Sequence, residues 1–217
     1  MYPCRGWMKR LAVLALCAVL VFAAAGCAKI VPIDQVGELT GNQAFDASES
    51  ASGLWAEAEA NIEGKAVDLP EFLTEANGDL KSLADQYGKY SMGTTGSISY
   101  AVKGTGTVEE VNTDKKAGYM VVKLDGYDGP EEIRIQIGDI YKGSSTRDTL
   151  DIVDFGDYTN QEEWAAISQE LHTLIAENVI APVDVSTLEG QAVDFVGTFT
   201  ADDDKELLIT AVKLDRI

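Results

Sequence analysis

The chain has 217 residues, of which 17 are Lys or Arg and 36 are Asp or Glu, so its formal net charge at pH 7 is -19. Hydrophobic residues make up 46% and charged residues 24%, a composition typical of a folded globular protein and not of a disordered chain. Proteins bind nucleic-acid phosphates and anionic lipid surfaces through Lys and Arg, so this acidic charge argues against either as a partner of the folded part.

The first 26 residues have the pattern of a secretory signal. Three basic residues within positions 1–10 precede an unbroken run of small or apolar residues over 11–26, which is short for a membrane span. The run ends in Ala-Ala-Gly before Cys27 and resembles the lipobox of bacterial lipoproteins. We therefore expect cleavage before Cys27 and lipidation of that cysteine. The alternative is an uncleaved signal anchor.

Cleavage would change both the charge and the cysteine count. It would remove three basic groups, leaving 191 residues with a formal charge of -22. Cys4 and Cys17 would leave with the signal, so no disulfide could form within the mature chain. Zinc sites built from cysteine are excluded as well, and a histidine cluster cannot form because His172 is the only histidine. We predict no metal and no cofactor.

The mature chain divides into a tether, a helical segment and a strand-rich domain. Residues 27–44 contain one proline and two glycines that interrupt any periodic pattern, which favours a lipidated tether. Residues 45–90 are predicted to be helical, with Pro70 in the first turn of a second helix and a third helix over 79–87. Residues 91–97 are expected to be a loop or linker.

Residues 97–217 are predicted to form the main domain. Residue alternation and turn signals predict strands at 98–111, 118–124, 133–137, 192–200 and 206–214. Gly104 and Gly106 lie where the long first strand could bulge and coil. Between the third and fourth strands, Thr159 and Glu162 form a predicted capping box. They begin a helix whose apolar face is lined by Trp164, Ile167, Leu171, Leu174 and Ile175.

Three strands, a helix and two further strands is the element order of an oligonucleotide/oligosaccharide-binding (OB) barrel. The predicted fold class is therefore α+β: an N-terminal helical segment followed by an OB-like five-stranded barrel with a helix between strands three and four. In that fold the helix plugs one end of the barrel, so we expect Trp164 and Leu171 to be buried against Val121, Ile135 and Phe195. An open antiparallel sheet covered by the same helix, or a sandwich, would also fit the pattern.

Seven short strings spread through the mature chain occur together and in order: residues 29–34 (KIVPID), 136–138 (QIG), 142–143 (KG), 147–148 (RD), 158–161 (YTNQ), 195–199 (FVGTF) and 208–214 (LITAVKL). In this combination the chain resembles a widespread, uncharacterised family of predicted periplasmic lipoproteins from bacteria. One departure is Ala28, which separates Cys27 from the KIVPI string expected directly after it. The resemblance implies an OB-like barrel, an anchored lipoprotein and genes often beside those of sugar-type ABC importers. It implies no reaction.

Residues able to carry catalysis are few. A nucleophilic Ser, Thr or Cys needs an activating base, and the only histidine, His172, lies at the edge of the predicted apolar helix face. A structural role is the simpler interpretation of that histidine. The acidic turns at 125–129 and 201–205 faintly resemble calcium loops, but the terminal glutamate of an EF-hand is missing, so we favour solvated hairpin tips over a calcium site. We predict no catalytic residue.

The connection over 142–161 is the best candidate for a binding surface, because it is long for a link between a strand and a helix and is rich in polar residues. The guanidinium of Arg147 in this connection could bind a carboxylate or a pair of sugar hydroxyls. The alternative is that Arg147 pairs internally with an acid and that Asn160 satisfies loop backbone. The predicted contacts of a ligand or partner are Lys142, Arg147, Asp148, Asn160 and Gln161.

These patterns favour a non-catalytic, membrane-anchored lipoprotein on the extracytoplasmic side, periplasmic or at the cell surface. We expect it to be an accessory or binding component near a sugar-type ABC import system. Its expected partners are the membrane, through the N-terminal lipid, and importer components or their binding protein. The alternative is a module that binds a small ligand such as a saccharide, and an enzyme is the least supported class.

Overall fold

The computed structural model describes residues 45–202 and 205–217, and these belong to one unit that begins at Phe45. The predicted lipidation site Cys27 and the predicted tether through residue 44 lie outside the described residues. Within the described ranges, no helix is both long enough and apolar enough to cross a membrane.

The N-terminal part of the unit is helical, as predicted. Helix α3 (Ala47–Glu63) begins at Asp46, whose carboxylate accepts hydrogen bonds from two backbone N–H groups of the first turn. Helix α4 (Leu69–Ala76) has Pro70 in its first turn, as expected, and ends at Asn77, whose φ of 47° is left-handed. The third predicted helix is a 3₁₀ turn, η2 (Leu80–Leu83), followed by the short α5 (Ala84–Tyr87).

The prediction of a loop or linker over 91–97 is wrong for most of this stretch, which is paired strand with a turn at residues 93–94. Strand β2 (Gly88–Met92) pairs antiparallel with the beginning of β3 (Thr95–Asn112). Gly93 and Gly96 have φ angles of 72° and 99°, which residues with a side chain rarely adopt, so the glycines permit the hairpin turn. Small polar residues that suggest a flexible link also suit a tight hairpin.

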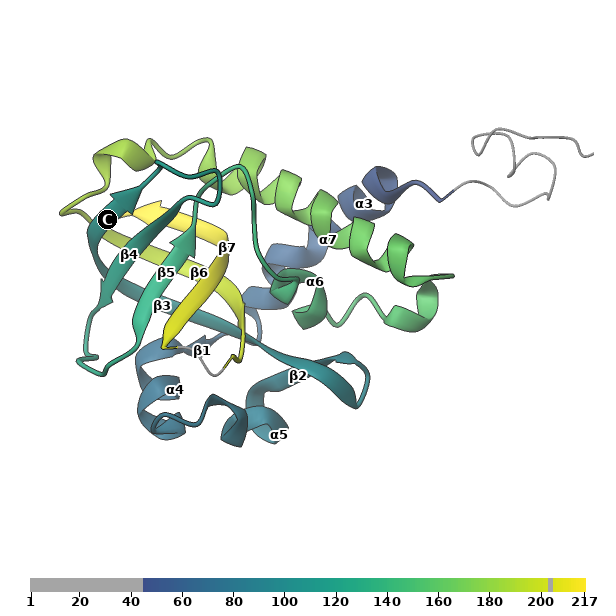
Figure 1. Ribbon diagram of the computed structural model, residues 1–217, viewed down its shortest axis with the longest axis horizontal. Helices are drawn as coiled ribbons and strands as arrows, with labels where there is room; N and C mark the ends of the chain where they lie inside the picture. Colours follow the sequence, from purple (N-terminus) through teal and green to yellow (C-terminus); the bar gives the residue numbers. More distant parts are fainter. Residues whose placement is uncertain (1–44, 203–204) are drawn as a thin grey trace, which may run out of the picture. The chain divides into compact units, whose positions relative to one another are not determined.

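The sheet has seven strands, two more than predicted (Figure 1). The remaining strands are β1 (Val67–Asp68), β4 (Tyr119–Leu124), β5 (Glu132–Gln136), β6 (Ala192–Thr200) and β7 (Glu206–Arg216). Five of the seven strands, β3 to β7, pair in the circuit β3–β4–β5–β7–β6–β3. Within this circuit only β5 and β7 are parallel. The extra strands, β1 and β2, both pair with β3. The predicted α+β, OB-like arrangement is confirmed.

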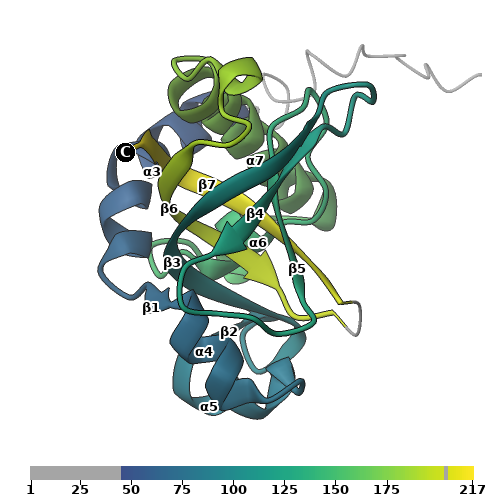
Figure 2. The same ribbon diagram turned by 90° about the vertical axis from the view of Figure 1, so that its left-hand side faces the viewer.

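Strand β3 is long enough to serve two partners, and it curves between them (Figure 2). Its residues 99–107 pair with β6 and its residues 106–112 pair with β4. A Cβ atom on Gly106 would lie 2.4 Å from the carbonyl oxygen of Lys123, so only glycine allows this approach. The register shift falls between Val108 and Glu110, slightly later than the predicted bulge.

An aromatic cluster joins the N-terminal helices to the sheet. Phe72 of α4 lies 4.8 Å from Tyr100 of β3 and 5.7 Å from Phe199 of β6, measured between ring centroids. All three side chains are buried, and the hydroxyl of Tyr100 donates to the carbonyl of Leu80 at 2.6 Å. The helical segment and the strands therefore share one hydrophobic core.

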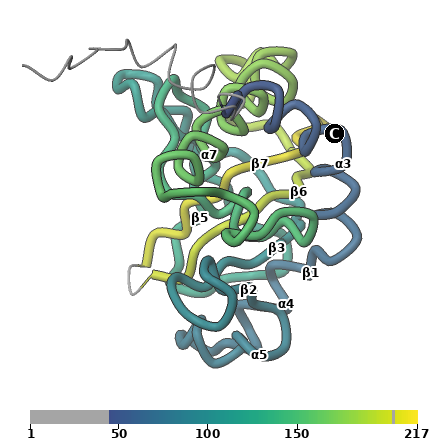
Figure 3. Tube along the Cα trace, turned by 90° about the vertical axis from the view of Figure 1, so that its right-hand side faces the viewer, coloured from purple at the N-terminus to yellow at the C-terminus, as the bar shows by residue number. Residues whose placement is uncertain are grey.

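Along the chain, helix α7 (Gln161–Ile175) lies between β5 and β6, as predicted. Its main packing partner, however, is α3 (Figure 1). Helices α4 and α5 lie at the opposite end of the sheet (Figure 3). Trp164 and Leu171 are buried. The predicted contact with Val121 is wrong, because the core residues of β4 are its alternating neighbours Met120 and Val122.

The start of α7 also differs from the predicted capping box by one residue. Asn160 is the N-cap, and its side-chain oxygen accepts from the backbone N–H of Glu163 at 2.9 Å. The carboxylate of Glu163 in turn accepts from the N–H of Thr159. The side chain of Asn160 therefore accepts a hydrogen bond from the backbone, in agreement with the alternative interpretation of this residue.

Candidate functional site

The connection between β5 and α7 contains a short helix, α6 (Ser145–Thr149), whose five polar residues are all buried. Thr198 of β6 supplies partners for two of them: its Oγ1 lies 2.9 Å from Ser145 Oγ and 3.1 Å from Thr146 Oγ1. Thr149 donates to the carbonyl of Ser145 at 2.6 Å. Because these groups have partners, a segment with the composition of a surface loop can lie in the interior.

Two lysines from the N-terminal part hold the end of α6. Lys65 donates to the carbonyl of Thr149 and to Asp151, both at 2.5 Å, and Lys89 donates to the carbonyl of Leu150. Burial lowers the pKa of Lys65, although its hydrogen bond to Asp151 acts in the opposite direction. Cations at this position satisfy the carbonyls that a helix leaves without partners at its C-terminal end.

Arg147 is fixed by contacts within the protein. Its Nε and Nη2 donate to Asp148 Oδ1 at 2.9 and 2.5 Å, and its Nη1 donates to the carbonyl of Trp164 at 2.8 Å. The guanidinium carbon lies 4.0 Å from the centre of the Trp164 ring. Arg147 and Asp148 are each 6% exposed. The structure therefore supports the alternative in which Arg147 pairs internally with an acid.

Burial raises the pKa of Asp148 above its ordinary value, and the neighbouring charge of Arg147 acts against that rise. Both hydrogen bonds from Arg147 end on Oδ1. Among the described residues, Oδ2 of the same carboxylate accepts no hydrogen bond. The ion pair thus keeps one acceptor oxygen available.

A cavity of about 490 Å³ lies over this ion pair, and we call it the Arg147 pocket. Arg147 and Asp148 lie beside the rings of Phe155 and Trp164, which are 5.8 Å apart between centroids in an edge-to-face arrangement. The remaining lining residues are mostly small or polar and come from the β2–β3 hairpin, the start of α6, the start of α7 and the end of β6: Ser91, Met92, Ser97, Gly143, Ser144, Gln161, Ala165, Thr200 and Asp202.

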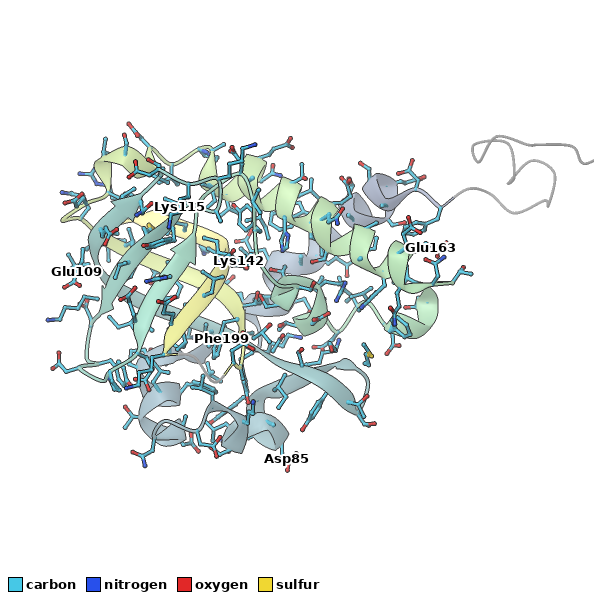
Figure 4. The ribbon with its side chains drawn as sticks, in the orientation of Figure 1. Asp85, Glu109, Lys115, Lys142, Glu163 and Phe199 are labelled. Atoms are coloured by element: carbon cyan, nitrogen blue, oxygen red, sulfur yellow. The ribbon has the colours of Figure 1, made fainter. Side chains whose placement is uncertain are left out.

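A second hollow of about 520 Å³, the sheet groove, lies against β4, β5 and β7. Arg134 pairs there with Glu206 at 2.6 Å and lies 4.4 Å from the centre of the Tyr119 ring. Buried Gln136 accepts from the backbone N–H of Lys142 at 2.7 Å and donates to its carbonyl at 3.1 Å. These bonds fix the backbone from which the exposed Lys142 side chain projects (Figure 4).

The structure divides the five predicted contact residues among three places. Arg147, Asp148 and Gln161 line the Arg147 pocket. Lys142 lines the sheet groove. Asn160 caps α7 and lines neither hollow.

Sequence reasoning missed several lining residues. Phe155 and Trp164 form aromatic walls of the Arg147 pocket, although Trp164 was assigned to a barrel core. Arg134 and Gln136 line the sheet groove. The signal that could have found the groove residues is the alternation of polar and apolar residues along a strand, because the polar positions share one face of the sheet.

The described ranges hold no group of three or more His, Cys, Asp or Glu side chains that could bind a metal ion. Asp203 and Asp204 of the second acidic turn lie outside those ranges. His172 stacks on Tyr141 with ring centroids 5.1 Å apart. Its Nε2 and the Oγ of Ser168, one helical turn earlier, are both buried and have no partner within the described part of the chain. They therefore do not form a base–nucleophile pair.

His172 should make the protein less stable in acid. Burial, with a further contribution from Arg147, lowers its folded-state pKa from 6.5 to about 4. The unfolded chain therefore takes up the proton first, and stability falls as the pH drops from 6.5 towards 4, by about 2–3 kcal/mol in total. We expect His172→Gln to lose this part of the pH dependence in urea unfolding curves at pH 7 and 4.5. Equal pH dependence in both proteins would contradict the assignment.

An OB-fold protein from Thermotoga maritima MSB8, solved by crystallography, is similar to this chain with a TM-score of 0.64 and 19% sequence identity. The match covers 81% of this chain and all of that one. Among curated protein sequences, none is significantly similar to this chain.

A family model described as predicted periplasmic lipoprotein (DUF2291) matches residues 17–215, which is nearly the whole sequence. The match includes the predicted lipidation site and reaches every element of the folded unit, ending one residue before the end of β7. The resemblance drawn from the sequence strings is confirmed at the level of the family, and so is the extracytoplasmic, membrane-anchored location. The chain belongs to this family of predicted periplasmic lipoproteins.

Proposed function

We propose that this lipoprotein acts by binding, without turnover, and that it holds a saccharide in the Arg147 pocket beside a sugar-type import system. The observation that carries the proposal is the fixed Arg147–Asp148 pair, which lines the pocket together with the rings of Phe155 and Trp164. Sugar hydroxyls both donate and accept hydrogen bonds, and Asp148 keeps a free acceptor for them. The apolar face of a sugar ring packs against aromatic side chains, and pockets of this size and mixed lining are typical of small-molecule sites.

Two observations support a role without catalysis. His172 and Ser168 are not hydrogen-bonded to each other, so the one histidine does not activate that hydroxyl. The Asp148 carboxylate is held by Arg147 on the face of Trp164. A carboxylate held in this way is suited to orienting a hydroxyl group.

The binding proposal is tested at the rim of the pocket. Gln161 is exposed and lines the Arg147 pocket, whereas Gln169 is exposed further along the same helix and lines neither hollow. We expect Gln161→Ala to weaken the binding of the tightest sugar from a monosaccharide panel about fivefold, as for the loss of one hydrogen bond. Gln169→Ala should bind normally. Calorimetry measures both, and a panel without any binding sugar would contradict the proposal.

An accessory role beside an importer follows from the sugar-binding proposal and from the resemblance to lipoproteins encoded near such systems. A protein on a lipid anchor remains close to membrane-bound partners. The test is co-purification of importer subunits or their binding protein with the native lipoprotein from solubilised membranes. Recovery of the lipoprotein alone under mild detergent would contradict this part of the proposal.

Membrane attachment should depend on Cys27, although this residue lies outside the described part of the chain. Two acyl chains hold a protein far more firmly than one, so a lipidated N-terminus keeps the protein in the membrane fraction. We expect Cys27→Ser to block lipidation and to release the protein, or leave its precursor unprocessed, while Cys17→Ser has no effect. Metabolic labelling with a fatty acid distinguishes the variants. Undiminished labelling of Cys27→Ser would show that another residue carries the lipid.

A further inference from the structure

The Arg147 pocket and the sheet groove adjoin each other. Gly143, Thr200 and Asp202 line both of them. The two volumes, about 490 and 520 Å³, each lie in the range of a complete small-molecule site. A ligand that fills both hollows must therefore be longer than the single sugar that the Arg147 pocket would hold.

The sheet groove differs from the rest of this acidic chain in its charge. Lys115, Arg134 and Lys142 line it together with Asp202 and Glu206, so cations exceed carboxylates there, whereas the whole chain has a formal charge of -19. Arg134 pairs with Glu132 at 2.5 Å and with Glu206 at 2.6 Å, so carboxylates already match its charge. Within the described ranges, the ammonium groups of Lys115 and Lys142 have no ion pair.

The two lysines come from different segments of the chain, and both line the groove. Lys115 belongs to the turn between β3 and β4, and Lys142 follows β5 (Figure 4). The side chain of Gln136 fixes the Lys142 backbone at both its N–H and its carbonyl. An anionic group near Tyr119 would lie in the hollow that both ammonium groups line, and each ion pair would contribute modestly because it is solvent-exposed.

We infer that the ligand is an acidic oligosaccharide, with one sugar unit in the Arg147 pocket and a uronic-acid unit in the sheet groove. This inference rests on the proposed saccharide binding and deepens it by naming the ligand class. At the boundary, the carboxylate of Asp202 is placed to accept hydroxyl groups, and Gly143 contributes no side chain that would separate the two units.

The test compares galactobiose with digalacturonate, which have similar size and hydroxyl pattern but differ in charge. We expect digalacturonate to bind the wild-type protein about tenfold tighter at low salt, as for two exposed ion pairs. The difference should disappear at high ionic strength and in the Lys115→Gln/Lys142→Gln variant, with galactobiose binding unchanged. Lys103→Gln is the matched control, since Lys103 is exposed on β3 and lines neither hollow.

The outcomes separate the two proposals. Equal affinity for the neutral and acidic disaccharides would overturn the acidic-ligand inference and leave saccharide binding intact. A preference for digalacturonate that persists in the double lysine variant would also overturn it, because the lysines would not be its cause. Failure of both disaccharides and of all monosaccharides to bind would overturn the proposed function and this inference together.

Discussion

Replacing Arg147 by alanine is expected to lower the free energy of unfolding by about 3–5 kcal/mol, the usual cost of removing one partner of a buried ion pair. The variant would leave the carboxylate of Asp148, which is 6% exposed, without its cation, and would remove the side-chain donor to the carbonyl of Trp164. Urea unfolding at pH 7 measures the loss. Since burial already raises the pKa of Asp148, protonation of this group should make the loss smaller near pH 4.

Arg134 provides the matched control. It also pairs with carboxylates, Glu132 at 2.5 Å and Glu206 at 2.6 Å, but those partners are 45% and 56% exposed. Water can solvate them when the cation is removed, so Arg134→Ala should cost about 1 kcal/mol or less. Similar losses in the two variants would mean that burial of the Arg147 pair does not determine its contribution.

Trp164→Ala is the second variant with a large expected effect, a loss of about 3–5 kcal/mol, as for other buried aromatic truncations. The side chain is 7% exposed and contacts the rings of Phe155 and Tyr158 as well as the guanidinium of Arg147. Its removal would open a cavity under the Arg147 pocket and end the cation–π contact. Thermal and urea unfolding together measure the loss.

Trp55 of α3 is the size-matched control, because it is only partly buried and packs at the edge of the core. Its replacement by alanine should cost clearly less than that of Trp164. A double replacement of Trp164 and Arg147 should cost less than the two single losses added, since the two side chains share a contact. Strict additivity would show that the cation–π contact contributes nothing.

The order of strands and helices could be predicted because each carries its own local pattern. Strand β6 occupies the predicted residues 192–200, where apolar and β-branched residues are bounded by turns. The two short strands were missed for a related reason. β1 has two residues, and β2 lies in a stretch rich in Gly and Ser, so neither contains a pattern long enough to detect.

The candidate site was harder to predict because its parts come from distant segments. Helix α6 is polar throughout and resembles an exposed loop until Thr198 of β6 is placed beside it. The sequence marked Arg147 as able to bind an anion, but only the fold shows that Asp148 and the carbonyl of Trp164 already accept three of its hydrogen bonds. Partners so far apart along the chain leave no periodic signal.

The double pairing of β3 also determines when this protein can fold. One part of β3 pairs with β4, which follows it closely, whereas residues 99–107 must wait for β6 near the end of the chain. Contacts of such high sequence separation make folding slow and delay it until nearly the whole chain is present. A chain that cannot complete its sheet early stays open during synthesis, which suits a protein whose place of work lies on the other side of a membrane.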